Sequence, residues 1–312
     1  MRAGLIYNPR SQRNRRGLDL RIPPDLRAAA PATQAELLAT LRAFAAQDVE
    51  LLIVSGGDGT LREVTTLLPQ AYGDRLPRLS LLAAGNANTV ASDVGSAGFD
   101  ADALRRVLDA ASAGRFSRRE SRPLLRVSWP DLDVAPVFGF FGGAAVLARA
   151  TRHANEKVLA NGITHKASVL VAVVNAVWRA ANGRPGWLGA EAMGIAIDDG
   201  EPRNGARFIV LVTTLNRLVM GLWPFWGDED RAVPLRYLDI DSPPSRLWRS
   251  LRAVLRGRPT ARMLASGYRS GRADRIRIHC EEPMVIDGEV FMPGPSAIVE
   301  LAAGPSIEFL TP

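Results

Sequence analysis

The sequence predicts two domains, an α/β domain over residues 1–120 and a mainly antiparallel, β-sandwich-like domain with a few helices over residues 121–312. Three observations support this prediction. A chain of 312 residues with 47% hydrophobic residues is long enough to form two ordinary cores. Up to about residue 120, short apolar runs alternate with patterns of helical spacing. Further on, apolar runs follow one another as strands joined by turns.

The first predicted strand covers residues 3–7 and ends in Asn-Pro-Arg-Ser at residues 8–11, which are residue types that favour a turn. The carboxyl ends of strands are the places where open α/β sheets bind ligands. The polar and turn residues at this strand end, Asn8, Pro9 and Ser11, are therefore candidate binding residues.

The central motif is a buried strand that breaks into a glycine-rich loop. Residues 51–54 are four consecutive apolar residues, and Ser-Gly-Gly-Asp-Gly-Thr follows at residues 55–60. Apolar residues then recur at helical spacing, so the prediction is strand, tight loop and helix. The glycines at 56, 57 and 59 allow the backbone to adopt positive φ and leave no side chain between the main chain and a bound group. Together with a helix N-terminus, this loop suits phosphate.

Asp58 stands out in this loop, because a carboxylate repels phosphate. It fits the loop only beside a magnesium ion or a proton in transfer. A turn that served the fold alone would not require this carboxylate. A structural strand-to-helix turn nevertheless stays the alternative for the loop as a whole.

The loop and the start of its helix, Gly-Gly-Asp-Gly-Thr followed by Leu-x-Glu-Val, resemble the nucleotide loop of the diacylglycerol kinase catalytic family. That family includes bacterial lipid kinases, sphingosine kinases and ceramide kinases. NAD kinases and phosphofructokinases have a shorter version, so the resemblance implies a Rossmann-type three-layer fold like theirs. It also implies that ATP binds along the loop, with Mg²⁺ near the aspartate. The implied contacts are Gly56, Gly57, Asp58, Gly59, Thr60, Leu61 and Glu63.

Two neighbouring segments also match that family. Residues 8–11 resemble its Asn-Pro-x-Ser-Gly motif, with Gln12 in place of the glycine. In the family a threonine near Thr33 contacts the nucleotide. Thr33 also forms a capping box with Glu36, which explains the threonine without any ligand.

The segment after the next predicted strand resembles the family's Pro-x-Gly-Thr-x-Asn-Asp motif. Gly85 and Asn88 match it, and both are implied nucleotide contacts. Asn86 stands at the threonine position and can still form hydrogen bonds with a phosphate or ribose. Thr89 stands at the aspartate position, where it supplies no negative charge.

A second signature lies near the C-terminus, where residues 287–289 read Asp-Gly-Glu. Asp-Gly alone is an ordinary hairpin turn. In the lipid kinases of the resembling family the glutamate of this tripeptide accepts a proton. The two motifs, about 230 residues apart, do not occur together in NAD kinases and phosphofructokinases. The resemblance therefore implies Asp58 and Glu289 as the catalytic residues, with a lipid hydroxyl entering between the domains.

Several segments of the second domain are candidates for lipid contact. Residues 218–227 hold three large aromatic residues, which either line an acyl-chain cleft or touch a membrane, or else fill the interdomain core. Residues 243–257 predict a basic amphipathic helix that either lies on an anionic membrane or packs on its own domain. Residues 166–181 predict an apolar helix, too short to span a bilayer, that covers a pocket. Residues 138–143 are a strand ending in paired glycines, which indicates either a close backbone approach or ordinary packing.

An acidic cluster occupies residues 228–230. Bacterial members of the resembling family hold a structural magnesium ion in this region, with an aspartate and backbone carbonyls just before a strand. Asp228 and Asp230 are therefore candidate metal ligands, and a solvated acidic turn is the alternative.

Charge and composition limit the class of protein. The net charge of +7 favours anionic partners such as a nucleotide or acidic lipid headgroups, whereas no nucleic-acid-binding motif accompanies it. Cys280 is the only cysteine, and His153, His165 and His279 lack zinc-ligand spacing. Neither a membrane span nor a signal peptide is predicted, so we expect a cytoplasmic protein, peripheral at the inner membrane face. The oligomeric state stays open.

The expected function is that of an ATP-dependent lipid kinase. Arg62 stands where the family usually has asparagine, and this difference, with Asn86 and Thr89, motivates an alternative. In that alternative the protein binds nucleotide or lipid but has lost catalysis. A kinase for a soluble substrate such as NAD is a third possibility. The acceptor can be diacylglycerol, a sphingoid base, phosphatidylglycerol or another lipid alcohol.

Overall fold

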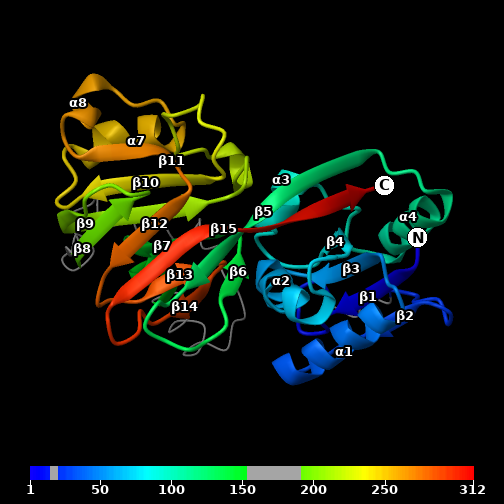
Figure 1. Ribbon diagram of the computed structural model, residues 1–312. Helices are drawn as coiled ribbons and strands as arrows, with labels where there is room; N and C mark the ends of the chain where they lie inside the picture. The colour runs from blue at the N-terminus through cyan, green and yellow to red at the C-terminus, as the bar shows by residue number, and fades with distance from the viewer. Residues whose placement is uncertain (15–19, 153–190) are drawn as a thin grey trace. The chain divides into compact units, whose positions relative to one another are not determined.

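The computed structural model describes residues 1–14, 20–152 and 191–312, and its contacts divide the chain into two compact units (Figure 1). Unit 1 consists of Met1–Leu124 and Pro305–Pro312, and unit 2 is Leu125–Gly304. The last eight residues thus belong with the N-terminal unit. The helix expected at residues 166–181 lies outside the described part of the chain.

Unit 1 is built on a parallel sheet. Its strands lie in the order β2 (Arg27–Ala29), β1 (Ala3–Tyr7), β3 (Leu51–Gly56), β4 (Arg78–Ala83) and the end of β15 (Ile298–Thr311). Every residue of β3 is buried, because helices cover both faces of the sheet. The central strand therefore consists of an apolar run without alternation.

Four helices accompany this sheet: α1 (Gln34–Ala46), α2 (Asp58–Tyr72), α3 (Thr89–Val94) and α4 (Ala101–Ala113). Figure 1 shows α1 and α2 on one side of the sheet, and α4 on the other. The α4 side has a core in which Leu104 and Val107 pack with Leu51 and Ile53 of β3. Two helical layers enclosing a parallel sheet give the three-layer α/β arrangement.

Unit 2 is rich in antiparallel strands. From one edge, the order is β14 (Glu289–Phe291), β13 (Met284–Ile286), β7 (Phe141–Ala145), β9 (Arg203–Thr213), β8 (Glu191–Ile197), β12 (Arg275–His279) and β15. Further strands extend this sheet. Strand β10 (Leu235–Asp241) pairs with β9, and β11 (Tyr268–Ala273) pairs with β10. Strands β5 (Arg118–Ser128) and β6 (Val137–Gly139) pair with each other. The described helices are η2 (Val219–Gly221), α7 (Leu247–Leu255) and α8 (Ala261–Leu264).

The predicted fold class, an α/β domain followed by a mainly antiparallel β domain, is confirmed. Residues 298–301 and 307–310, which are separate apolar runs in the sequence, are parts of the single strand β15. Gly304 and Pro305 lie between a stretch that pairs with β12 and Phe309, which pairs with Leu79 of β4. The two residues interrupt the pattern of the sequence without ending the strand. Across the described ranges, no helix is both long and apolar enough to cross a membrane.

Candidate active site

Three loops of unit 1 meet along one edge of its parallel sheet. The strands β1, β3 and β4 are adjacent and parallel, and they end at Tyr7, Gly56 and Ala83. Their following loops therefore share the carboxyl edge of the sheet, where α/β folds bind ligands. The turn at Asn8, the central glycine loop and the loop containing Gly85 all lie here. The fold thus brings together candidate binding residues from three separate stretches of sequence.

Asn8 links the first of these loops to the second. Its side-chain Nδ2 donates a hydrogen bond of 2.9 Å to Oγ1 of Thr60, in the first turn of α2. Its Oδ1 accepts the amide of Arg10 at 2.9 Å, which closes the turn. Because the Thr60 hydroxyl accepts from Asn8, it still has its own hydrogen to donate. Thr60 is thus oriented as a donor at the start of α2.

Asn14 is a residue of this region that the sequence did not reveal. Its Nδ2 donates to the carbonyl oxygen of Asn8 at 2.8 Å and to Oγ of Ser55 at 3.3 Å. Its Oδ1 is buried and has no hydrogen-bond partner within the described residues. Asn14 lies in an arginine-rich stretch that resembles a solvated loop, and no local pattern marks it.

The glycines of the central loop allow close packing, whereas the positive φ that glycine permits is not adopted. None of Gly56, Gly57 and Gly59 has a positive φ, and Gly57 is extended, with φ −99° and ψ −175°. A Cβ atom on Gly85 would lie 2.4 Å from Cα of Gly57, and one on Gly56 would lie 2.6 Å from Cβ of Thr60. The central loop can approach the Gly85 loop, and α2 can start so close to the end of β3, only because side chains are missing at these positions.

The N-terminus of α2 lies directly behind this contact. The helix begins at Asp58 and runs for 15 residues, and its N-cap Gly57 supplies no side-chain hydrogen bond. The first amides of a helix have no partner within the helix, and the helix dipole makes this end positive. An uncapped helix start beside glycines fits a phosphate group in both charge and available space.

The Asp58 carboxylate holds the start of α3. Its Oδ2 accepts the amide of Thr89 at 3.0 Å, and its Oδ1 accepts the amide of Val90 at 3.2 Å. Burial raises the pKa of Asp58, and the hydrogen bonds from these two residues oppose that rise. The carboxylate thus has a structural use, contrary to the expectation that a turn alone would not require it. A remaining lone pair is compatible with a metal ion or a metal-bound water.

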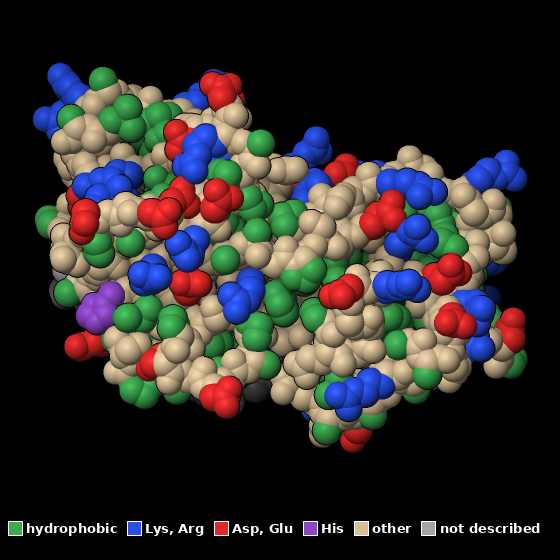
Figure 2. All heavy atoms as spheres, in the orientation of Figure 1, with side chains coloured by type: hydrophobic (Ala, Val, Ile, Leu, Met, Phe, Trp, Pro, Cys, Tyr) green, Lys and Arg blue, Asp and Glu red, His purple; other side chains and the backbone are tan. Residues whose placement is uncertain are grey.

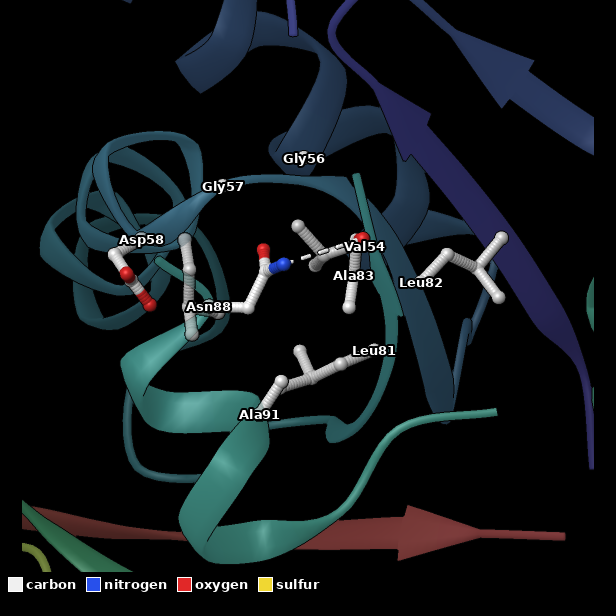
Figure 3. Close-up of a pocket in the computed structure, with 10 residues that line it drawn as sticks. Val54, Gly56, Gly57, Asp58, Leu81, Leu82, Ala83, Asn88 and Ala91 are labelled. Atoms are coloured by element: carbon white, nitrogen blue, oxygen red, sulfur yellow. Dashed lines mark hydrogen bonds between the residues drawn. The ribbon is translucent and has the colours of Figure 1, made fainter. Parts of the chain in front are cut away.

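Asn88 shapes the third loop from within. It adopts a left-handed conformation with φ 51°, its Oδ1 accepts the Gly85 amide at 3.0 Å, and its Nδ2 donates to the Gly85 carbonyl at 2.9 Å. Figure 3 shows the same amide pointing towards the carbonyl of Ala83, at 3.4 Å. Asn86 is exposed. Asn88 therefore maintains the loop conformation, while Asn86 is the loop residue available to solvent.

A small pocket lies beneath the glycine contact, between β3, β4 and α3 (Figure 3). Asp58, Asn88 and Ala91 are among its lining residues, and its volume is about 10 Å³. A cavity of this size holds about one water molecule. It is too small for a nucleotide, so the surface for a larger ligand is the outer side of the loops.

The far end of α3 is also fixed. Arg122 Nε lies 2.7 Å from Asp93 Oδ2, and both side chains are buried. Arg118 donates to the carbonyl oxygen of Asp93 at 2.7 Å. Because Asp58 holds one end of this short helix and the two arginines hold the other, the loop at Asn88 has a fixed position.

Thr33 is confirmed as a helix cap. Its Oγ1 accepts the amide of Glu36 at 3.2 Å, and Glu36 Oε2 accepts the amide of Ala32 at 2.8 Å. This is the capping box that the sequence predicted. Among the other predicted contacts of unit 1, Pro9 is exposed, Ser11 is half-buried and Leu61 is buried. Oε1 of Glu63 lies 3.9 Å from Nη2 of Arg62.

Glu289 follows the turn of a tight hairpin in unit 2. Asp287 and Gly288 form the turn with φ 45° and 88°, and Ile286 pairs with Glu289 across the hairpin. A two-residue turn with positive φ at both positions is the reason for the Asp-Gly sequence. Glu289 is half-buried at the start of β14. The carboxylate is therefore held on a strand and not on a free loop.

Asp287 ties this hairpin to the neighbouring strand. Its Oδ2 accepts the amide of Phe140 and its Oδ1 the amide of Phe141, both at 3.0 Å. A Cβ atom on Gly139 would lie 2.5 Å from Asp287 Oδ2. The close backbone approach proposed for residues 138–143 is therefore explained by the Asp-Gly-Glu turn, which packs against this segment. The sequence indicated the glycines but not their partner.

The acidic cluster at residues 228–230 is less suited to a metal ion. Asp228 Oδ2 accepts the amide of Arg272 at 3.4 Å, and Asp230 is exposed. No group of three or more His, Cys, Asp or Glu side chains in the described part of the chain is arranged to hold a metal ion. A metal at Asp228 would therefore need backbone carbonyls or water as further ligands.

Comparison with known proteins shows similarity in the part of the chain that carries this site. Residues 2–116 match the family model described as diacylglycerol kinase catalytic domain. The curated relatives include the "Probable lipid kinase YegS" of Escherichia coli O1:K1 and of Shigella boydii serotype 18, each 44% identical over 66 residues. That match covers 21% of this chain and 21% of each relative. Residues 2–116 of the chain are thus similar to the diacylglycerol kinase catalytic domain.

Solved structures support the fold over the full chain. The crystal structure of a "putative diacylglycerol kinase" from Bacillus anthracis has a TM-score of 0.68 at 17% identity and covers all of this chain and 97% of its own. A further diacylglycerol kinase structure from the same organism has a TM-score of 0.61 at 15% identity, with the same coverage. At this level of identity the likeness shows the fold alone.

Proposed function

We propose that the protein is a lipid kinase that transfers the γ-phosphoryl group of ATP to a hydroxyl group of a lipid. The observation that carries this proposal is the meeting of the uncapped α2 N-terminus with the Gly57–Gly85 contact at the carboxyl edge of the sheet. This arrangement provides amide donors and removes the side chains that would block phosphate oxygens. The similarity of residues 2–116 to a kinase catalytic domain supports ATP as the donor.

In this proposal the loop residues bind and orient the triphosphate. The first amides of α2 and the Thr60 hydroxyl donate to phosphate oxygens, and Asn8 keeps the Thr60 hydroxyl oriented through its 2.9 Å hydrogen bond. Gly56, Gly57, Gly59 and Gly85 allow the main chain to approach. Phosphoryl transfer depends largely on such positioning and on neutralisation of charge.

Magnesium is the proposed metal, and it would supply positive charge to the phosphate oxygens when bound. Asp58 is the proposed residue to hold it, directly or through water. The two amides and the Thr89 side chain use three of the about four lone pairs of the Asp58 carboxylate, and the remaining one fits this role. Asp228 and Asp230 are proposed for a second ion, for which backbone carbonyls would have to complete the ligand set.

Glu289 is the proposed general base that takes the proton of the acceptor hydroxyl. Its position on β14, fixed by the Asp287 hydrogen bonds, supports this role because a base must be held within reach of one proton. The Asp-Gly-Glu sequence favours a lipid acceptor such as diacylglycerol or a sphingoid base. With ATP as donor and a lipid as acceptor, the proposed location is the cytoplasm, at the anionic inner face of the membrane.

The test is incubation of the full chain with ATP radiolabelled in its γ-phosphate, Mg²⁺ and a lipid extract dispersed in detergent micelles. We expect label in the organic phase, and mass spectrometry of the labelled product then identifies the acceptor lipid. Parallel reactions contain NAD in place of lipid. ATP binding without any labelled product would overturn the kinase in favour of a binding protein, and labelled NADP would overturn the lipid acceptor.

A second candidate function, binding without catalysis, has one observation in its favour. Arg62, at the position of the family's asparagine, is buried and lies beside Glu63 on α2. A buried cation near the glycine loop alters the charge that the nucleotide meets. Arg62→Asn distinguishes the two functions, because a variant with much greater transfer than the natural chain would indicate that Arg62 impairs catalysis.

A further inference from the structure

An open apolar groove lies between η2 and α7 of unit 2. Met220 and Leu222 form one wall, and Trp248, Leu251 and Leu255 form the other. Its volume is about 530 Å³. The exposed fraction is 82% for Met220 and 47% for Trp248, so the groove presents large apolar side chains to solvent. The sequence indicated residues 218–227 and 243–257 as separate candidates for membrane contact, and the fold brings them together.

The walls of this groove are fixed to each other. The amide of Trp223 donates to the carbonyl oxygen of Leu255, the last residue of α7, at 3.0 Å. A Cβ atom on Gly257 would lie 2.4 Å from the carbonyl oxygen of Phe225. The loop and the helix end therefore pack backbone against backbone. The exposed side chains of the groove lie on a rigid support.

Met220 is held in a conformation that its side chain does not favour. Its φ of 59° is left-handed, a region that glycine or asparagine normally occupies, and the following Gly221 also has a positive φ. A large apolar side chain that is 82% exposed contributes nothing to the stability of the fold at this turn position. Such a residue is explained by an apolar environment that the isolated chain does not provide.

Arg252 and Arg256 line the groove, and further arginines without a described ion-pair partner lie on α7 and in the segment that follows it. Residues 242–267 contain six arginines and no Asp or Glu. All six are exposed, and none forms an ion pair with a described residue: Arg246, Arg249, Arg252, Arg256, Arg258 and Arg262. Figure 2 shows basic and hydrophobic side chains together at the end of unit 2 where Figure 1 labels α7 and α8. In contrast, Arg207 and Arg269 of the same unit pair with aspartates.

We propose that this α7 surface, defined by Met220, Leu222, Trp248, Arg249, Arg252 and Arg256, docks onto an anionic lipid bilayer. Tryptophan and arginine suit the interface, because one part of each side chain is apolar and the other contacts headgroups. Each arginine near an anionic surface adds to the attraction. The inference rests on the proposed function, since a kinase for lipid acceptors must meet them in a membrane.

The charge of the surface decides between a bilayer and a second copy of the chain. A symmetric dimer through this groove would bring two sets of six arginines together, and like charges repel. A bilayer containing acidic lipids supplies the opposite charge and accepts the apolar side chains together. The bilayer is therefore the occupant that satisfies both features.

The experiment is cosedimentation of the full chain with vesicles of phosphatidylcholine, with and without phosphatidylglycerol. We expect binding that requires phosphatidylglycerol and that weakens when salt rises from about 0.1 M to about 1 M, because the Debye length falls from about 10 Å to about 3 Å. The triple variant Arg249→Gln, Arg252→Gln, Arg256→Gln should bind at least about tenfold more weakly. Met220→Ser with Trp248→Ser should also lose binding, because the apolar contact is removed.

Matched controls remove the same side chains elsewhere. Arg42→Gln, Arg75→Gln, Arg115→Gln removes three other exposed arginines, and Met292→Ser removes another exposed methionine, 65% accessible. Both controls should retain the vesicle binding of the natural chain. The proposal is overturned if the controls lose as much binding as the α7 variants, or if binding does not depend on phosphatidylglycerol. A dimer in sedimentation velocity that Met220→Ser abolishes would also overturn it in favour of self-association.

Transfer in detergent micelles separates this proposal from the proposed function. The α7 variants should lose vesicle binding but keep transfer to lipid in neutral detergent micelles, where no bilayer has to be found. If the natural chain binds anionic vesicles and transfers no phosphate, the proposed function fails while the docking surface stands. If it transfers phosphate in micelles and does not bind vesicles, the docking surface fails alone.

Discussion

Gly57 and Gly85 come so close that a Cβ atom on Gly85 would lie 2.4 Å from Cα of Gly57. The two residues follow neighbouring strands, β3 and β4, and their contact sets the distance between two of the three loops at the candidate active site. The contact is asymmetric, because a Cβ atom on Gly57 would lie 3.1 Å from Cα of Gly85. The asymmetry allows a graded test of the loop arrangement.

Gly85→Ala should be more damaging than Gly57→Ala. The methyl group on Gly85 cannot fit without backbone movement, so we expect a loss of roughly 1–3 kcal/mol in the free energy of unfolding. Gly57 is extended, and its methyl group needs only a small shift, so its cost should be below about 1 kcal/mol. Urea unfolding measures both, and titration with ATP should show weaker binding for Gly85→Ala. Equal effects of the two substitutions would contradict the described contact.

Asp58→Asn should affect both stability and turnover. An asparagine can accept only one of the amides of Thr89 and Val90 and turns an N–H group towards the other, which costs roughly 1–3 kcal/mol of unfolding free energy. If Asp58 also holds magnesium, turnover should fall by about 10²-fold or more. Unfolding and steady-state kinetics measure the two effects.

Asp93→Asn is the matched control for Asp58→Asn. It weakens the buried pair with Arg122 at the other end of α3 and leaves the Asp58 carboxylate in place. At a temperature where both variants are folded, Asp93→Asn should retain most of its turnover. An equal loss of turnover in both variants would mean that Asp58 acts only by positioning α3.

Glu289→Gln and Asp287→Asn should differ in a way that assigns their roles. Glu289→Gln removes the proposed base, so turnover should fall by about 10²- to 10⁴-fold with little change in ATP affinity or stability. Asp287→Asn tolerates the left-handed φ of 45° but loses one of two amide hydrogen bonds, so stability should fall as well. Unchanged turnover in Glu289→Gln would show that another group accepts the proton.

Features that depend on local sequence were predictable. Residues 101–113, with apolar residues at helical spacing, form α4, and Gly114 ends the helix with a left-handed φ of 64°. The capping box at Thr33 and the strand and helix around the central loop were also predicted correctly. In each case the signal is a cap, a breaker or a periodicity within a few residues, and these act through the backbone of the same segment.

Features that depend on contacts between distant segments were not predictable. Position 85 carries glycine because of position 57, and Gly139 makes room for Asp287, almost 150 residues away. Asn14 has no local signature, because its partners are the Asn8 carbonyl and the Ser55 hydroxyl. A motif identifies such residues as special, but only the fold shows what each of them contacts.

The Arg269–Asp241 pair predicts how stability responds to acid. Nη1 and Nη2 of Arg269 lie 2.7 Å from the two carboxylate oxygens of Asp241. The Arg269 hydrogen bonds lower the pKa of Asp241, and partial burial opposes them more weakly. Because the folded pKa lies below that of the unfolded chain, the pair stabilises the fold at neutral pH. This contribution to stability is lost as the pH falls below about 4, the pKa of an aspartate in the unfolded chain, and then through the lower pKa of Asp241 in the folded chain.

Asp241→Asn should therefore be less stable than the natural chain at neutral pH, and the difference should shrink as the pH falls below about 4. Urea unfolding followed by tryptophan fluorescence over a pH series measures this difference. Asp133→Asn is the control, because Asp133 is exposed and forms no ion pair with a described residue. Its stability should follow that of the natural chain at every pH. A difference for Asp241→Asn that stays constant down to acid pH would mean that the carboxylate is not stabilised by Arg269.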